Sequence, residues 1–397
     1  DDPFHGDREV GLQWIGEQDW EYTREFEAPP GLCGCQRVLL VCEGLDTLAS
    51  LTLNGKPVGE TDNMFRRWRF EVGELLKAGT NRITVRFSAP MPYVRAREEN
   101  QHLRTPKCVA HEPHGRPYLR KEQCNFGWDW GPVLVTSGIF RDMRLEGVER
   151  GRIEDVHVRQ RHSGGQVSLD VTVSVADRTT PLRVAASLEL DGNEVASDER
   201  AARSSTTRCR LRIDDPRLWW PNGLGEQPLY DLRVESIDDG GAPVHAVHKR
   251  IGLRTLGLRR RKDRWGESFE FVANGVAFFA KGSNWIPADA INGRMTRERY
   301  RHLLSSAAAS HQNMIRIWGG GYYEEEDFYD LCDELGLCVW QDFMFACSAY
   351  PTFEPGFIDN VRGEVEDNVR RLRHHASLAL WCGNNELEQM PGQITET

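Results

Sequence analysis

Two hydrophobic patterns divide the chain. Up to about residue 148, short apolar runs separated by turn residues predict strands, as at 37–42, 51–53 and 83–87, and Asn54-Gly55 predicts a tight hairpin turn. Strict alternation of apolar and polar residues follows over 167–173 and 186–190. We therefore expect a jelly-roll β-sandwich over residues 1–148 and an immunoglobulin-like β-sandwich over residues 149–257.

A different pattern begins at residue 258. Apolar runs at 277–282, 314–318, 337–340 and 378–382 predict buried strands, and apolar residues at helical spacing predict helices over 297–310, 324–335 and 358–374. Strands that alternate with helices indicate βαβ units and a parallel sheet. A (β/α)8 TIM barrel has eight such units in ~250 residues. We therefore expect residues 258–397 to be the N-terminal half of a TIM barrel that is truncated in this chain.

Composition narrows the classes of partner. A net charge of −10 argues against nucleic acid, and no apolar run is long enough to span a membrane. The 10 cysteines form no disulfide framework, and no Asn-x-Ser/Thr sequon occurs. We therefore expect a cytoplasmic protein, with the bacterial periplasm as the alternative. Cys33-Gly34-Cys35 lacks the further ligands of a closed metal site, so we expect neither a metal nor a cofactor. The pattern does not predict an oligomeric state.

Polar and aromatic residues follow each expected strand of the third part, where the active site of a barrel lies. These segments are Ser283-Asn284-Trp285, Gly319-Gly320-Gly321, Gln341-Asp342 and Gly383-Asn384-Asn385-Glu386. Aromatic faces and carboxylates together are typical of a sugar site. Glu386 is the strongest candidate, since a glycosidase needs a protonated carboxyl with a raised pKa. The alternative is a solvated glutamate in a loop or at a helix start.

Other polar residues favour a structural interpretation. No second carboxylate in the chain is a compelling nucleophile, and we expect Asp342 to have a binding or structural role. Glu324-Glu325-Glu326-Asp327 predicts a helix N-terminus, favoured by the helix dipole. His374-His375 is expected to be a solvated cap at a helix end.

Six motifs give the chain a specific resemblance. They are Phe126-Gly127-Trp128-Asp129-Trp130-Gly131-Pro132, Leu218-Trp219-Trp220-Pro221-Asn222-Gly223, Lys281–Asp289, Asn313–Gly321, Val339–Cys347 and Trp381-Cys382-Gly383-Asn384-Asn385-Glu386. In this order they resemble the β-mannosidases of glycoside hydrolase family 2. The resemblance implies a retaining exo-β-mannosidase that acts on terminal, non-reducing β-D-mannose, with a β-mannoside or manno-oligosaccharide as substrate. It also implies a nucleophile after a seventh barrel strand, so this chain alone is expected to be inactive.

The same resemblance assigns roles to individual residues. Glu386 would be the acid/base, and Asn385 would hydrogen-bond the substrate near its 2-hydroxyl. Arg316 would orient the nucleophile, and Trp318 would line the sugar subsite. The loop with Trp128 and Asp129 would hold the mannose, and Asn284 and Trp285 would line the site.

Each assignment has an alternative. Trp128 could belong to the sandwich core, and Arg316 could pair with a core acid. For Asp129 we favour function, because a buried unpaired carboxylate is costly. The alternative activities are those of a family 2 β-galactosidase or β-glucuronidase, and the alternative class is a non-catalytic carbohydrate-binding fragment.

Overall fold

The described residues up to 148 fold into the expected β-sandwich. The structure, a computed structural model, describes residues 2–101, 103, 105, 113–148, 150–176 and 181–389. A four-stranded sheet in the order β1-β7-β4-β5 faces a three-stranded sheet in the order β11-β2-β6. Their bounds are Trp20–Glu27 (β1), Thr80–Phe87 (β7), Ala49–Leu53 (β4), Lys56–Thr61 (β5), Met143–Val148 (β11), Arg37–Cys42 (β2) and Trp68–Glu71 (β6).

The core of this first sandwich comes from alternate residues of both sheets, among them Leu40, Leu51 and Phe87. Asn54 and Gly55 have φ angles of 55° and 78° and join β4 to β5, as the hairpin signal predicts. Shorter elements complete this part: α1 (Arg8–Gly11), α2 (Pro90–Asn100), β3 (Leu45–Asp46), β8 (Phe126–Trp128), β9 (Gly131–Val133), β10 (Gly138–Ile139) and 3₁₀ turns at Gln13–Glu17, Leu32–Gly34, Gly73–Leu75, Arg116–Tyr118 and Gln123–Asn125.

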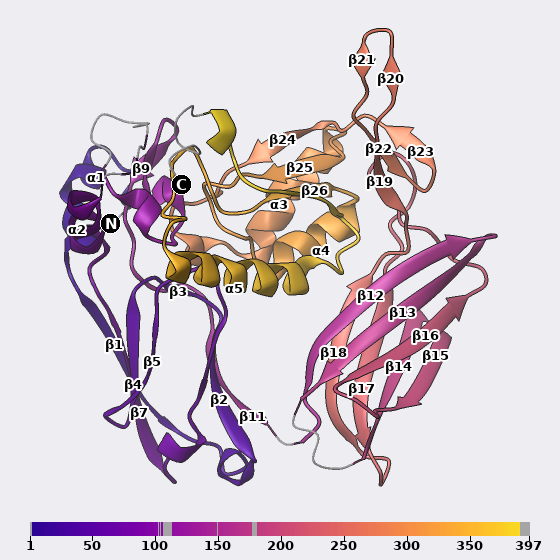
Figure 1. Ribbon diagram of the computed structural model, residues 1–397, viewed down its shortest axis with the longest axis horizontal. Coiled ribbons are helices and arrows are strands. Elements are labelled where there is room, and N and C mark those ends of the chain that lie inside the picture. Colours follow the sequence, from indigo (N-terminus) through magenta and orange to yellow (C-terminus); the bar gives the residue numbers. More distant parts are fainter. Residues whose placement is uncertain are drawn as a thin grey trace.

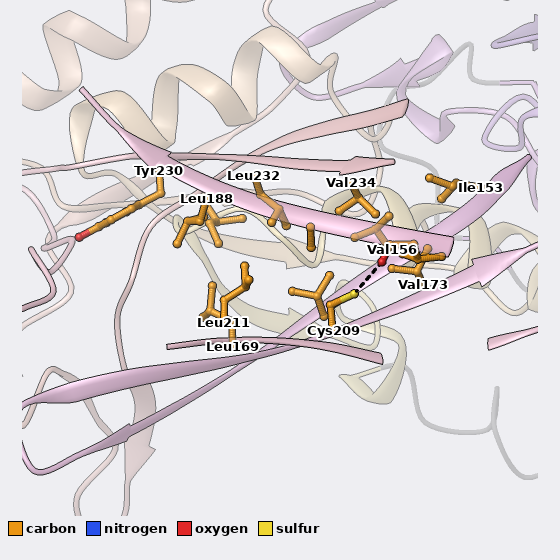
Figure 2. Packing of buried hydrophobic residues seen from close by; sticks show 14 of the residues in the cluster. Ile153, Val156, Leu169, Val173, Leu188, Cys209, Leu211, Tyr230, Leu232 and Val234 are labelled. Carbon is orange, nitrogen blue, oxygen red and sulfur yellow. Dashed lines mark hydrogen bonds between the residues drawn. The ribbon is translucent and has the colours of Figure 1, made fainter. Parts of the chain in front are cut away.

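A second sandwich of seven strands follows. One sheet has the order β12-β13-β16 and the other β15-β14-β17-β18. Figure 2 shows Leu169 and Leu211 of the first sheet pointing toward Leu188 and Leu232 of the second, which is how alternating sequences build a core. The strands are Ile153–Ser163 (β12), Gln166–Val175 (β13), Thr206–Ile213 (β16), Asn193–Ala201 (β15), Leu182–Leu190 (β14), Tyr230–Asp238 (β17) and Pro243–Ile251 (β18).

The third part begins differently from the prediction. Residues 256–278 form small antiparallel sheets, and a hairpin projects from the molecule at β20–β21 (Figure 1). The predicted strand at 277–282 is therefore wrong: Val276–Phe278 pairs with the antiparallel neighbour β22, and Phe279 is 81% exposed. The elements are β19 (Leu256–Arg259), β20 (Lys262–Asp263), β21 (Gly266–Glu267), β22 (Glu270–Ala273) and β23 (Val276–Phe278).

Four parallel strands then alternate with three helices. The sheet order is β24-β25-β26-β27, and every neighbouring pair is parallel. Acidic residues occupy the first turn of α4, and Gly336 ends this helix with φ 71°. The elements are β24 (Gly282–Trp285), α3 (Arg297–Ala309), β25 (Met314–Ile317), α4 (Glu326–Leu335), β26 (Cys338–Asp342), α5 (Pro355–Leu372) and β27 (Leu378–Cys382), with 3₁₀ turns at Asn292–Arg294 and Leu387–Gln389.

Both sandwiches pack against this third part (Figure 1). From the first sandwich, Arg120 makes a two-pronged ion pair with Glu364 of α5 at 2.7 and 3.0 Å, and both side chains are buried. From the second, Trp219 is fully buried and donates its indole N–H to the Asp333 carbonyl at 2.8 Å. The three parts therefore share buried interfaces, and the first sandwich lies against the helix that precedes β27.

Candidate active site

The carboxyl ends of the four parallel strands bring together residues that are far apart in the sequence. Asn284 of β24 and Arg316 of β25 are register partners, so their side chains emerge on the same face of the sheet. Asp342 ends β26, and Asn385 follows β27. The polar side chains expected at this edge of the sheet are in fact neighbours.

Arg316 is the centre of this polar network. Its guanidinium donates to both oxygens of Asp342, from Nε at 3.2 Å and from Nη2 at 2.7 Å. It also donates to Asn284 Oδ1 at 3.1 Å and to Asn385 Oδ1 at 2.8 Å. The Arg316 guanidinium thus orients side chains at the ends of three other strands. Its pairing with the buried Asp342 also agrees with the structural alternative, in which Arg316 pairs with a core acid.

Asp342 is held firmly in place. Besides Arg316 it accepts hydrogen bonds from the backbone N–H of Gly319 at 3.0 Å and from the indole N–H of Trp340 at 3.1 Å. Burial raises the pKa of Asp342, and the neighbouring Arg316 guanidinium opposes this shift. The carboxyl is fully buried and engaged by protein donors, which suits an anchor for Arg316 better than a group that contacts substrate.

Glu386 lies one residue beyond Asn385 and is exposed. Its φ angle is +62°, in the left-handed region that non-glycine residues rarely occupy. The Cys347 thiol donates to Glu386 Oε2 at 3.4 Å, and Asn385 Nδ2 donates to the Cys347 sulfur at 3.3 Å. The carboxyl is therefore fixed beside Asn385 while remaining open to solvent.

Three tryptophans form an aromatic cluster next to this carboxyl. The ring of Trp318, which follows β25, meets Trp128 at a centroid distance of 4.7 Å and Trp130 at 5.6 Å, both edge to face. Trp128 and Trp318 share a buried cluster with Cys347, which links them to Glu386. Trp128 is 9% exposed and Trp130 is 41% exposed, so Trp130 offers more aromatic surface to a ligand.

The structure corrects the argument for Asp129. This residue is exposed rather than buried, so the cost of burying a carboxylate says nothing about its role. It lies in the turn between β8 and β9, beside the tryptophan cluster. Its two chain neighbours, Trp128 and Trp130, are the members of this cluster that come from the first sandwich, and a role of Asp129 in binding substrate stays a prediction.

Trp285 is the predicted site residue that the structure does not bring to the others. It alternates with Asn284, so its side chain points to the helix-covered face of the sheet and packs against Phe328 at 4.9 Å. Its indole N–H donates to Glu324 Oε1 at 2.7 Å. The strand begins at Gly282 rather than five residues earlier, and this shift decides which residues face the site.

Two neighbours of the candidate site were not singled out from the sequence. Arg116, fully buried in the first sandwich, donates to the backbone carbonyls of Ala346 and Cys347 at 3.4 and 3.3 Å. Its guanidinium lies 4.9 Å from the centroid of the Trp128 ring. Cys347 ends the motif Val339–Cys347, and its place after the third expected strand is a sequence signal that could have indicated a role in the site.

The described residues include one group of possible metal ligands, Asp330, Asp333 and His375, whose ligand atoms lie within 4.8 Å of one another. Although burial opposes it, Asp333 raises the pKa of His375 to about 9. His375 Nδ1 lies 2.7 Å from Asp333 Oδ2, and Asp333 Oδ1 accepts the Ser377 backbone N–H at 2.7 Å, so contacts within the protein account for this buried pair. Among the helices described, none is long and apolar enough to cross a membrane.

Family models match the two sandwiches. Residues 1–141 match the glycosyl hydrolase 2 galactose-binding domain-like model, and residues 151–254 match the glycosyl hydrolases family 2 model. Both models describe parts of the same family of enzymes.

Similar proteins match nearly the whole chain. Beta-mannosidase B of Emericella nidulans is 38% identical over 99% of the chain and 47% of the relative, and that of Thermothelomyces thermophilus is 41% identical over 97% and 45%. The crystal structure of the β-D-mannosidase from Dictyoglomus thermophilum is similar with a TM-score of 0.90 and 39% identity, over 97% of this chain and 48% of that one. The chain spans about half the length of the relatives it matches.

Proposed function

The chain belongs to glycosyl hydrolase family 2, and from this premise we propose that its protein is a retaining exo-β-mannosidase. The resemblance drawn from six sequence motifs is confirmed, since the chain is similar to β-mannosidases over almost all its length. The proposed reaction is hydrolysis of terminal, non-reducing β-D-mannose residues. A β-mannoside or manno-oligosaccharide would be the substrate.

One observation carries this proposal. Glu386, at the carboxyl end of β27, lies beside a cluster that joins Trp128 of the first sandwich to Trp318 of the third part. A sugar at this place could pack against aromatic surface while its glycosidic oxygen meets the carboxyl. Because the first sandwich forms one wall, the pocket would be closed on that side, which favours cleavage at a chain end.

In the proposed mechanism Glu386 has two tasks. It protonates the leaving oxygen as the first bond breaks, and it then removes a proton from the water that releases the sugar. Asn385 would hydrogen-bond the sugar near its 2-hydroxyl, and Asp129 would bind a hydroxyl at the non-reducing end. Arg316 positions Asn385 directly, through the 2.8 Å hydrogen bond between them.

A retaining mechanism also needs a nucleophilic carboxylate about 5 Å from the acid/base. Asp342 does not suit this role, because its oxygens are buried and engaged by Arg316, Gly319 and Trp340. We propose that the nucleophile belongs to a strand outside residues 1–397. The 397-residue chain would then be inactive by itself.

The same reasoning supports a half barrel as the architecture of the third part. Its four parallel strands and three helices follow one another as in the first half of a (β/α)8 barrel. Within the described part of the chain, β24 and β27 each pair with one strand of this sheet, so the sheet could be extended at either edge. The proposed domains are residues 1–148, 149–257 and 258–397. One family model matches within the first of these domains and the other within the second.

An assay with 4-nitrophenyl glycosides tests this proposal. We expect the polypeptide extended to the length of its relatives to hydrolyse the β-D-mannoside at least 100-fold faster than the β-D-galactoside or β-D-glucuronide, by kcat/KM. The 397-residue chain, measured in parallel, should show no turnover. Good galactoside or glucuronide activity without mannoside activity would refute the proposed substrate.

A further inference from the structure

Cys347 occupies an unusual place between the two residues that are expected to meet the substrate. Its sulfur accepts a hydrogen bond from Asn385 Nδ2 at 3.3 Å, and its thiol donates to Glu386 Oε2 at 3.4 Å. One side chain thus holds the amide and the carboxyl in a fixed relation. A neighbour that donates to a carboxylate oxygen restricts its rotation, which is what a group that must meet one substrate oxygen requires.

The backbone supports this contact. Beyond the ends of β26 and β27 the two segments stay paired, through Asn385 N–H to Phe345 O at 2.9 Å and Cys347 N–H to Asn385 O at 3.1 Å. Cys347 and Glu386 both have left-handed φ angles, 45° and 62°. Non-glycine residues adopt this conformation at a cost, and such residues cluster at functional sites. The pairing aims the two side chains at each other.

The first sandwich holds this segment from the other side. Arg116 donates to the carbonyls of Ala346 and Cys347, and its guanidinium also lies over the Trp128 ring. The residue is fully buried and comes from a 3₁₀ turn far from the strand ends in sequence. A single side chain therefore connects the proposed mannose-binding loop to the segment that contacts Glu386.

We propose that Cys347 is a positioning residue for Glu386, and that Arg116 of the first sandwich acts on the acid/base through Cys347. The inference rests on the proposed role of Glu386 and adds a dependence of the acid/base on the sandwich domain. Cys347 acts only through the Glu386 carboxyl, and Arg116 acts only through the segment that holds Cys347. Their loss should therefore slow the step that needs protonation of the leaving group more than it slows the reaction in general.

The test compares substrates that differ in their need for an acid. In the extended polypeptide, Cys347→Ala should lower kcat/KM for mannobiose about tenfold more than for 2,4-dinitrophenyl β-D-mannoside, as expected for a lost hydrogen bond. Cys347→Ser, which keeps a donor and an acceptor, should recover part of this difference. Arg116→Lys, which cannot donate to both carbonyls as the guanidinium does, should change the substrate ratio in the same direction. The double variant with Cys347→Ala should show no larger change in the ratio than Cys347→Ala alone.

Cys332→Ala is the matched control, because Cys332 is buried behind the sheet, in the cluster with Phe328 and Leu331. It should lower the melting temperature without changing the substrate ratio. Equal losses for both substrates with Cys347→Ala and Cys347→Ser would overturn the inference. Glu386→Gln separates the acid/base role of Glu386 from the positioning role of Cys347. If Glu386→Gln leaves the substrate ratio unchanged, the proposed acid/base is wrong. If Glu386→Gln changes the ratio and Cys347→Ala does not, only the inference about Cys347 is contradicted.

Discussion

Glu324 is a buried carboxyl whose oxygens meet no cation among the residues that the structure describes. It accepts hydrogen bonds from the Trp285 indole at 2.7 Å and the Tyr300 hydroxyl at 2.5 Å. Burial raises its pKa to about 7, although these hydrogen bonds lower it. Since an unfolded glutamate titrates near 4.3, the folded state binds more protons between the two values. Stability from this group is therefore present below the lower value and is lost as the pH rises through about 7.

Glu324→Gln should remove this dependence, because the amide has a similar shape and no charge. We expect the variant to be more stable than the parent at pH 8 by about 1–3 kcal/mol, and to differ much less at pH 5. Urea unfolding at both pH values measures the difference. Glu366→Gln, at an exposed position of α5, is the control and should change stability little. If the free energy of unfolding of the variant minus that of the parent were smaller at pH 8 than at pH 5, the raised pKa of Glu324 would be contradicted.

At the scale of single residues, the sequence indicated which residues belong to the site better than it indicated where their side chains point. Placement after a strand selected Asn385 and Glu386, and the family resemblance selected Arg316; Arg316 donates to Asn385 Oδ1, and Cys347 joins Asn385 to Glu386. It failed for Trp285, since one residue of register decides which face of a sheet a side chain occupies. It could not indicate Arg116 at all, because that residue reaches the strand ends only through the packing of two domains.

Among the elements, β25 and β27 follow the predicted runs to within a residue, because each is a short buried strand with turn residues on either side. The region before β24 differs from the prediction, which assigned the apolar run 277–282 to a buried strand. Asn274-Gly275, with φ angles of 48° and 84°, forms the tight turn between β22 and β23. Asn-Gly is the strongest short hairpin signal, and here it should have outweighed the apolar run.

The end of α5 shows a second difference from the prediction. His375 is buried rather than a solvated cap, and its Nδ1 lies 2.7 Å from Asp333 Oδ2. Asp333 also accepts the backbone N–H of Ser377 at 2.7 Å, just before β27 begins. The histidine thus belongs to an ion pair that ties α4 to the start of the strand leading to Glu386. Sequence neighbours alone could not show this, since Asp333 is 42 residues away.

For the whole molecule, the order of the parts was predictable and their packing was not. The motif Trp219-Trp220-Pro221-Asn222 indicated only a family resemblance. In the structure Trp219 anchors the second sandwich to α4, and the Asn222 side chain donates to the carbonyls of Ala308 and Gln312 at 2.9 and 2.8 Å. The motif is therefore a docking element.

Trp219→Ala should destabilise the chain by about 3–5 kcal/mol, because it removes a fully buried indole and its hydrogen bond. Trp265→Ala is the matched control: Trp265 lies at the projecting hairpin and is 81% exposed, so its loss should change stability by less than about 0.5 kcal/mol. Chemical unfolding of both variants measures the contrast. Equal effects would show that Trp219 does not anchor the domains.

The central claim is that Glu386 protonates the leaving group of a β-mannoside. Glu386→Gly in the extended polypeptide, assayed with 2,4-dinitrophenyl β-D-mannoside in the presence and absence of azide, tests it most directly. We predict that azide, which needs no general base, restores turnover and yields β-mannosyl azide, while hydrolysis of mannobiose stays slower by about 10²–10⁴-fold. Undiminished hydrolysis of mannobiose by this variant, or turnover that azide leaves unchanged, would contradict the claim.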